Sequence, residues 1–481
     1  MWRATAIFVL STALGTSGAA AQNTPGDQDR DLDLIPQGAV AAKPAGAAAA
    51  VGPAAAAKVI NTSADRVYVE DAVTVASRRG RLAVSAPAPV PFHWQERLFL
   101  DIRKEWRLAG LTFTYSGRVN FRAEDDLDFP THENLINDLR EAYLSWQPSD
   151  RTYFDLGRVN LKSGVALGYN PTDFFRTRAV VEPLSADPTV LREDRLGTLM
   201  LRGQQLFGAG SITVAFAPEV YRPGPIYTNT SLPSLDPMLD RTNASNRFLV
   251  KSSINLGDRL SPELLLYREG NRTRFGTNLA EGIGQKVVAY LEWSGGRRAS
   301  LIDDALRYGR DTGTLPVEAP SVIPEDSHVR FQSELAVGAS YTTESRATFN
   351  LEYHFNQAGF ARADWRNWFA VGQGRSGSSP VAGELWYLRG YALDQQNPIS
   401  RHSAFLRASW VDAFVPKLEL TGFVNTDLYD GSGLVQLTAD YYVSDHWTIG
   451  GLMSDNFGSS RSDFGSLGSA ASFMVKVARY F

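Results

Sequence analysis

Hydrophobic and polar residues alternate along most of the chain after His93. In the stretch RLFLDIRKEWRL, Leu98 and Leu100 fall on one face of a strand, and Asp101 and Arg103 fall on the other. The next stretch, LTFTYSGRVNFR, repeats the scheme with aromatic residues in its apolar row. Alternation over about ten residues at a time, with aromatics on the apolar side, is typical of strands that line a membrane-spanning barrel.

The alternation recurs to the end of the chain and predicts about seventeen strands from residue 95 onward. Their connections alternate between short turns, such as QPSD and TTES, and much longer stretches. Barrels of the outer membrane have short periplasmic turns and long extracellular loops. An even, antiparallel closure then needs one more strand within residues 65–90. The sequence therefore predicts an all-β, transmembrane antiparallel barrel of 18 strands, with 16 as the alternative.

The last nine residues, FMVKVARYF, form an alternating run of their own. Phe473, Val475, Val477 and Phe481 share one face of the predicted strand. An edge strand of a soluble sandwich is the alternative to a closing barrel strand. A strand that closes a barrel needs no polar tail, because its outer face meets lipid and its edge meets the first strand.

The composition of the chain indicates where the protein is located and how the chain divides into segments. Residues 1–21, with Arg3 before an apolar run and small residues at the end, predict a cleaved signal peptide. Residues 22–92 are rich in Ala and Pro and predict a largely disordered periplasmic segment, and residues 93–481 are assigned to the barrel. No later stretch reaches the roughly 20 apolar residues of a membrane helix. A net charge of −4 gives no support for nucleic-acid binding.

The search for catalytic or metal-binding chemistry is unproductive. The chain has no cysteine, and its six histidines are scattered without the spacing of a metal site. No nucleophile elbow, phosphate loop or dinucleotide fingerprint is found. We therefore expect no metal, no cofactor and no enzymatic activity, although a triad assembled across strands stays open as an alternative.

Residues 163–194 form a long connection that contains GYNPTDFFRTR. Pro171 ends a strand, and the neighbouring Asn and Asp side chains favour a turn. If this connection folds into the barrel, Asp173, Arg176, Arg178 and Glu182 line a constriction. The alternative is an outward loop whose motif only stabilises a turn.

The inward-facing rows of the early strands are rich in basic residues. We expect these cations to line the pore and to face the acidic groups Asp173 and Glu182 across it, which would set up a transverse field. The predicted basic wall consists of Arg103, Arg107, Arg118, Arg122, Arg158 and Lys162.

Two stretches resemble known barrel proteins. The terminal run resembles the signal read by the outer-membrane assembly machinery, with Arg479 as a departure from the usual apolar residue. The stretch REAYLSWQPSDRTYFDLGRVNLKSGVALGYNPTDFF resembles a proteobacterial family of outer-membrane barrels of unassigned function, similar to alginate-export barrels and substrate-specific porins.

The resemblance implies a barrel in the Gram-negative outer membrane whose partners are lipid and the assembly machinery. The expected function is a porin-like channel for small polar or charged solutes. The alternatives are an export barrel that passes a polysaccharide or lipid-like product from a periplasmic partner, and a barrel enzyme.

Overall fold

The computed structural model describes residues 65–86, 93–125, 135–181, 183–226, 236–256, 260–316, 321–324 and 328–481. The predicted signal peptide and residues 22–64 and 87–92 of the predicted periplasmic segment lie outside the described residues.

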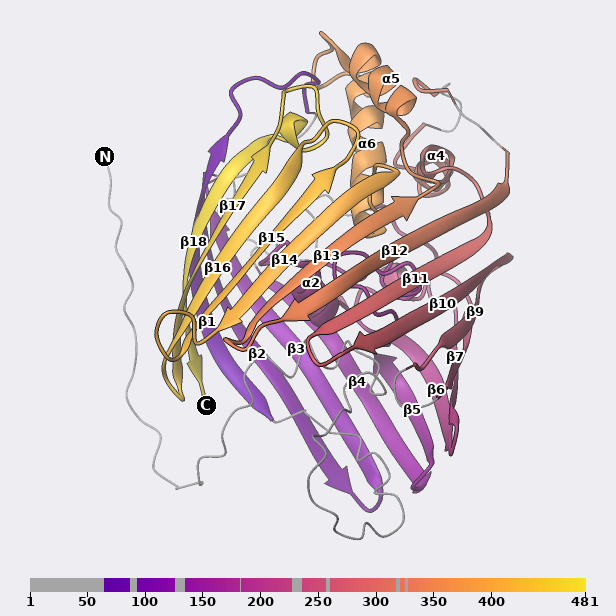
Figure 1. Cartoon of the computed structure of the whole chain (residues 1–481). Coiled ribbons are helices and arrows are strands. Elements are labelled where there is room, and N and C mark those ends of the chain that lie inside the picture. Colours follow the sequence, from indigo (N-terminus) through magenta and orange to yellow (C-terminus); the bar gives the residue numbers. More distant parts are fainter. Residues whose placement is uncertain are drawn as a thin grey trace.

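The described strands form one closed antiparallel sheet of 18 strands (Figure 1). This confirms the predicted 18-stranded barrel, and the alternative of 16 strands is wrong. Short turns connect the strands at one end and most of the long connections lie at the other, so the first end is periplasmic and the second extracellular. The strands are β1 (Arg66–Arg78), β2 (Trp94–Leu108), β3 (Leu111–Glu124), β4 (Leu135–Ser149), β5 (Thr152–Val159), β6 (Thr198–Phe207), β7 (Gly210–Ala217), β8 (Arg247–Ile254), β9 (Glu263–Glu269), β10 (Arg272–Ile283), β11 (Val287–Arg298), β12 (Arg330–Thr342), β13 (Ala347–Asn356), β14 (His402–Val411), β15 (Leu418–Asp427), β16 (Gly433–Ser444), β17 (Trp447–Phe457) and β18 (Ser469–Tyr480).

Strand β1 lies inside the segment that the sequence assigned to the periplasm, so the expected barrel boundary at residue 93 is wrong. The parity of the turns had predicted a strand between residues 65 and 90, and β1 is that strand. Its alternation is weak because the exposed Asp71 interrupts the outward row of Val73 and Val75, while Tyr68 and Ala72 are buried on the other face. Pairing with both neighbours, rather than the pattern of its side chains, therefore holds β1 in the wall.

The barrel closes where β1 pairs with β18 on one side and with β2 on the other. Val73 lies opposite Val475 in this seam, and the backbone N–H of Phe481 donates to the carbonyl of Val67 at 3.0 Å. The prediction that the last strand pairs with the first is confirmed.

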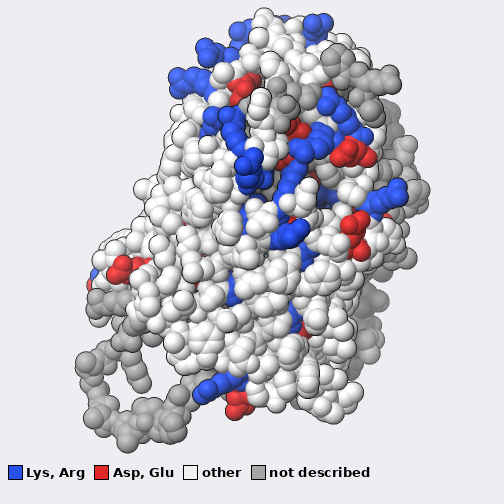
Figure 2. Space-filling model, turned by 90° about the vertical axis from the view of Figure 1, so that its right-hand side faces the viewer, with Lys and Arg blue, Asp and Glu red and all other residues white. Residues whose placement is uncertain are grey.

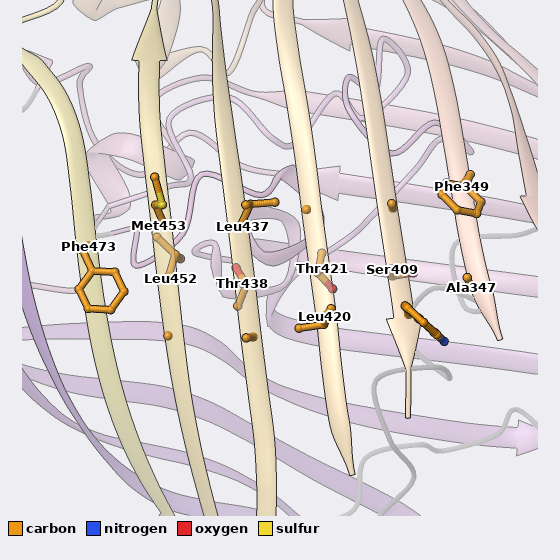
Figure 3. A pocket seen from close by; sticks show the side chains of 15 residues that line it. Ala347, Phe349, Ser409, Leu420, Thr421, Leu437, Thr438, Leu452, Met453 and Phe473 are labelled. Carbon is orange, nitrogen blue, oxygen red and sulfur yellow. The ribbon is translucent and has the colours of Figure 1, made fainter. Parts of the chain in front are cut away.

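The outer face of the barrel is apolar, with large hydrophobic side chains exposed along nearly every strand. Between β13 and β18 it holds a shallow groove of about 540 Å³, and Figure 3 shows Phe349, Leu437, Met453 and Phe473 reaching into it from four of these strands. Stacked aromatic pairs such as Trp106–Phe113 lie close to the short turns. An exposed apolar belt on a sheet without free edges is what a strand-built membrane span requires.

A helical cap covers part of the extracellular end (Figure 1). It packs Ile302, Trp368, Leu385 and Leu388 into one buried cluster, joined by Val84 from the β1–β2 connection. Among the described residues no helix is long and apolar enough to cross a membrane. The cap consists of α4 (Leu301–Asp311), α5 (Arg362–Gly372) and α6 (Pro380–Asp394). The other helices among the described residues are α2 (Pro188–Asp194), α3 (Leu239–Thr242) and the 3-10 turn η2 (Phe464–Ser466).

Candidate functional site

The connection between β5 and β6, residues 160–197, folds into the barrel, and we call it the crossing loop. Its residues Ala166, Thr172 and Asp173 are at most 1 % exposed. The backbone N–H of Asp173 donates to the carbonyl of Asn170 at 3.1 Å, which closes the turn predicted around Pro171. Figure 1 shows α2, which belongs to this loop, within the outline of the barrel.

Glu292 on the inner face of β11 holds the first half of the crossing loop. Its carboxylate accepts from the backbone N–H groups of Val165 (2.9 Å), Ala166 (3.2 Å) and Thr172 (2.7 Å). A Cβ at Gly164 would lie 2.5 Å from the same carboxylate, so only glycine permits this approach. A buried carboxylate is stable only when such donors replace water, so Glu292 and the loop stabilise one another.

Glu352 on β13 forms a second anchor of the same kind. It accepts from the backbone N–H groups of Leu167 (2.6 Å) and Gly168 (3.0 Å), and also from the Tyr290 hydroxyl at 2.8 Å. His354 lies 2.6 Å from its other side and completes a buried polar cluster. Two wall carboxylates thus bind consecutive backbone segments of one loop.

The second half of the crossing loop reaches the wall farther along the sheet. Asp187, which also caps the N-terminus of α2, contacts Arg407 of β14 at 3.2 Å. The backbone N–H of Ala186 donates to Gln436 of β16 at 2.9 Å. Since the loop leaves β5 and touches β11, β13, β14 and β16, it spans the lumen, and any solute must pass alongside it.

Asp173, predicted to line the constriction, pairs within the loop itself. It makes two contacts with Arg195, at 2.7 and 3.1 Å, and lies 3.5 Å from Arg192. Glu182, its predicted companion, lies outside the described residues. The carboxylate of Asp173 is therefore neutralised locally and does not face the basic wall across open water.

Arg176 and Arg178 tie the crossing loop to the end of α6. Arg176 donates to the side chain of Asn397 at 2.7 Å. Arg178 lies 3.4 Å from Asp394, which also pairs with Arg241 at 2.6 Å. Both predicted residues lie in the lumen, and both are 4 % exposed because they are structural contacts between loop and cap.

The predicted basic wall is largely buried under the crossing loop. Arg118 is 4 % exposed and contacts Asp101 and Asp194, each at 3.0 Å. Arg158 donates to the carbonyls of Gly197 and Pro237, and Arg122 is equally buried. These three residues face inward as predicted, and Arg118 and Arg158 hold the loop in place, whereas Arg122 lies 3.8 Å from Glu124 of its own strand. All three are buried and present no exposed charge to a pore.

The remaining predicted cations are Arg103 and Arg107 of β2 and Lys162 of the crossing loop. Arg103 contacts Glu141 at 2.8 Å, with 30 % of its side chain exposed, and Lys162 pairs with Glu193 of the crossing loop. Arg107 is exposed at the end of β2, beside the short turn. Further lumenal pairs join cations and acids of nearby strands: Arg202–Asp155, Lys251–Glu263 and Lys476–Asp440. Arg103, Arg118 and Asp173 thus each have a close counter-charge, so the described residues give no support to the transverse field expected from sequence, of which Glu182 lies outside them.

The residues that anchor the loop were not singled out in advance. Glu292 and Glu352 could be recognised only as acids in inward rows, and Arg195 and Asp394 lie in connections without periodicity. The sequence did offer one signal: each of these two residues is an acid in the middle of a barrel strand, and a carboxylate that is buried there needs hydrogen-bond donors from another segment.

One arrangement bears on the enzymatic alternative. Ser403 lies 3.5 Å from Nδ1 of His354, whose other ring nitrogen contacts Glu352. The distance is long for a hydrogen bond, both Ser403 and His354 are buried, and a Cβ at Gly168 would lie 2.8 Å from the His354 ring. Within the described part of the chain, no group of three or more His, Asp or Glu residues could hold a metal ion.

The site and fold together define a transmembrane β-barrel whose lumen is crossed by an anchored loop. No family model matches the chain, and no curated protein matches it. The resemblance to the alginate-export type and to a barrel family of unassigned function stays a prediction.

Solved structures of porins are similar to the chain at low identity. OccAB1 of Acinetobacter baumannii is 9 % identical with a TM-score of 0.49, covering 87 % of this chain and 96 % of its own. OccK11 (OpdR) of Pseudomonas aeruginosa is 10 % identical with a TM-score of 0.47, covering 87 % and 95 %. A mutant porin of Rhodopseudomonas blastica is 10 % identical with a TM-score of 0.38, covering 87 % and 99 %. At these values the architecture rests on the strand pairing of the chain itself.

Proposed function

We propose that the protein is a porin-like channel of the Gram-negative outer membrane for passive passage of small polar or charged solutes. The observation that carries the proposal is the crossing loop, which subdivides a barrel too wide to be filled by side chains alone. Water fills the space beside the loop, and the anchored backbone sets the size limit.

The paired charges supply the expected selectivity. Ion pairs such as Arg103–Glu141 and Lys251–Glu263 give the lumen polar walls with little net field. Such walls favour hydrated solutes over apolar ones and discriminate weakly between cations and anions.

Planar bilayers containing the purified protein test the proposal. We expect discrete conductance steps and a small reversal potential across a salt gradient. Uptake of uncharged sugars of increasing size into proteoliposomes should fall sharply at one size. Bilayers without conductance steps, together with proteoliposomes that admit no sugar, would contradict a channel.

Export of a polysaccharide or lipid-like product remains the second candidate, with residues 22–64 as a docking segment for a periplasmic partner. The deletion that tests it must stop before residue 65, because β1 is part of the wall. A channel should conduct normally without residues 22–64, whereas an exporter should lose delivery of its product in cells.

A further inference from the structure

A pair of arginines stands on the outer face of the barrel at its extracellular end. Arg268 on β9 and Arg297 on β11 are both exposed. They belong to outward rows, as the apolar Leu266 on β9 and the half-exposed Phe275 on β10 do. Among the described residues neither arginine has an ion pair. Arg268 donates to the carbonyl of Gly270 at 3.0 Å and Arg297 to that of Val329 at 3.2 Å, so both charges lack a counter-charge.

The register places these two arginines on either side of one threonine. Arg268 lies opposite Thr273 of β10, and Arg297 comes to the same level one residue beyond the Arg274–Gly296 pair. Two strand spacings separate the arginines, or about 10 Å, which their long side chains can close around one small anion. The Thr273 hydroxyl between them adds a further donor.

Aromatic side chains continue the same row on both sides. Phe248 lies opposite Arg268, and Phe331 lies opposite Arg297. Phe331 also stacks on Trp293, with ring centroids 6.4 Å apart. Rows of aromatics mark the level where the apolar belt of a barrel meets the headgroups, so the two guanidinium groups stand at headgroup height.

Figure 2 shows this side of the molecule, with Lys and Arg gathered toward the extracellular end above a largely uncharged band. Arg272 and Arg307 contribute to the basic surroundings, but each is matched by Asp304. The unmatched positive charge of the outward row therefore lies on Arg268 and Arg297.

We propose that Arg268, Thr273 and Arg297 bind the phosphate group of a phosphorylated lipid in the outer leaflet. The guanidinium groups bind the phosphate oxygens by charge-assisted hydrogen bonds. The acyl chains of the same lipid lie along the apolar rows below, over Leu266 and Phe275. This double requirement distinguishes a lipid headgroup from free phosphate, which would gain only the polar contacts.

Native mass spectrometry of the full chain in detergent, titrated with bis-phosphorylated lipid A, tests the proposal. We expect the double variant Arg268→Gln, Arg297→Gln to bind lipid A about ten- to a hundredfold more weakly at low salt, from the loss of two charge-assisted contacts. The matched control is Arg151→Gln, Lys417→Gln, which removes two exposed cations at the periplasmic end and should leave lipid A binding unchanged.

Two further experiments distinguish binding of a phosphorylated lipid from binding of free phosphate. Enzymatically dephosphorylated lipid A should bind the wild type about as weakly as lipid A binds the double variant. Inorganic phosphate at millimolar concentration should not displace lipid A. Wild-type affinity in the double variant, tight binding of the dephosphorylated lipid, or displacement by inorganic phosphate would each overturn the assignment.

Discussion

Glu292 accepts a hydrogen bond of 2.7 Å from the backbone N–H of Thr172, although 120 positions separate the two residues along the chain. The contact joins a wall strand to the tightest turn of the crossing loop. Since the same carboxylate also accepts from Val165 and Ala166, it determines the position of the whole first half of the loop.

Replacing Glu292 by Ala should release this half of the crossing loop. Each buried donor left without a partner costs about 1–3 kcal/mol, so the free energy of unfolding should fall by at least about 2 kcal/mol. Single-channel conductance should rise and become noisier. Glu419→Ala is the matched control, because Glu419 bonds Tyr442 on a wall strand. Equal conductance in the two variants would show that the loop does not limit flow.

Arg118→Gln and Arg103→Gln should behave differently. Arg118 is buried between two acids, so its loss should destabilise the protein by about 3–5 kcal/mol with little change in reversal potential. Arg103 is partly exposed, and its loss uncovers Glu141, which should shift the reversal potential toward cation preference at low salt. If the reversal potential shifted for Arg118→Gln and not for Arg103→Gln, the conducting path would run past Arg118 instead of past Arg103.

Leu420 and Thr421 both border the outer groove of Figure 3. Thr421 pairs with Ser409 and shares a row with the buried pair Arg407 and Phe423, so by alternation its side chain faces inward and that of Leu420 faces outward. Leu420→Arg should cost about 2–4 kcal/mol if the site lies near the bilayer midplane. Thr421→Arg should be tolerated, because that side chain enters the lumen. Urea titrations in lipid vesicles measure both, and equal costs would contradict the assignment of the faces.

Deletion of Phe481 should reduce the amount of folded, heat-modifiable barrel in the outer membrane. Phe481 bonds the backbone of Val67, and Arg479 lies over its ring at 5.1 Å. Loss of the residue removes part of the seam as well as the proposed assembly signal. Removing a residue from a periplasmic turn, such as Pro416 between β14 and β15, is the control. Unchanged levels at low expression would contradict a role for Phe481.

Asp463, in the loop before η2, gives the extracellular end a pH dependence. Burial raises the pKa of Asp463 from 3.8 to about 7, even though Arg389 lies 2.6 Å away, and the nearby Asp427 and Asp430 add to the rise. A raised carboxyl pKa means that the folded protein holds the proton more tightly than the unfolded chain. Its contribution to stability is therefore full below about pH 4 and is lost as the pH rises toward 7.

The variant Asp463→Asn should abolish this pH-dependent contribution to stability. Between pH 5 and pH 8 the melting temperature of the wild type should fall relative to that of the variant, with the largest relative change below pH 7. Parallel melting curves for the two proteins across that range would show that Asp463 ionises normally in the folded state.

Local alternation was enough to predict the strands, because the two faces of a barrel wall meet different solvents. It was weakest at β1, where Asp71 interrupts the outward row, and there the parity of the turns supplied the missing strand. The faces of Arg118 and Arg158 were likewise predictable from the alternation.

The partners of these residues were not predictable. Whether Arg118 faces water or Asp194 depends on how residues 160–197 are placed, and that placement rests on Glu292 and Glu352 in distant strands. A periodicity of two reveals which side of a strand is inside, but it carries no information on what fills the inside. The sequence therefore could not show that Arg118 and Asp173, predicted to contribute to a field across the lumen, are paired with opposite charges.

The seam between β1 and β18 differs from every other strand pair in how its partners meet. Each other pair joins neighbours in the chain, whereas Ser77 and Ala471 bond across 394 positions. Until β1 and β18 pair, the sheet has two unpaired edges, and β18 of one nascent chain could pair with β1 of another. We therefore expect the nonlocal seam to form in the slow step of folding, and crowded insertion to produce strand-swapped dimers rather than misregistered monomers.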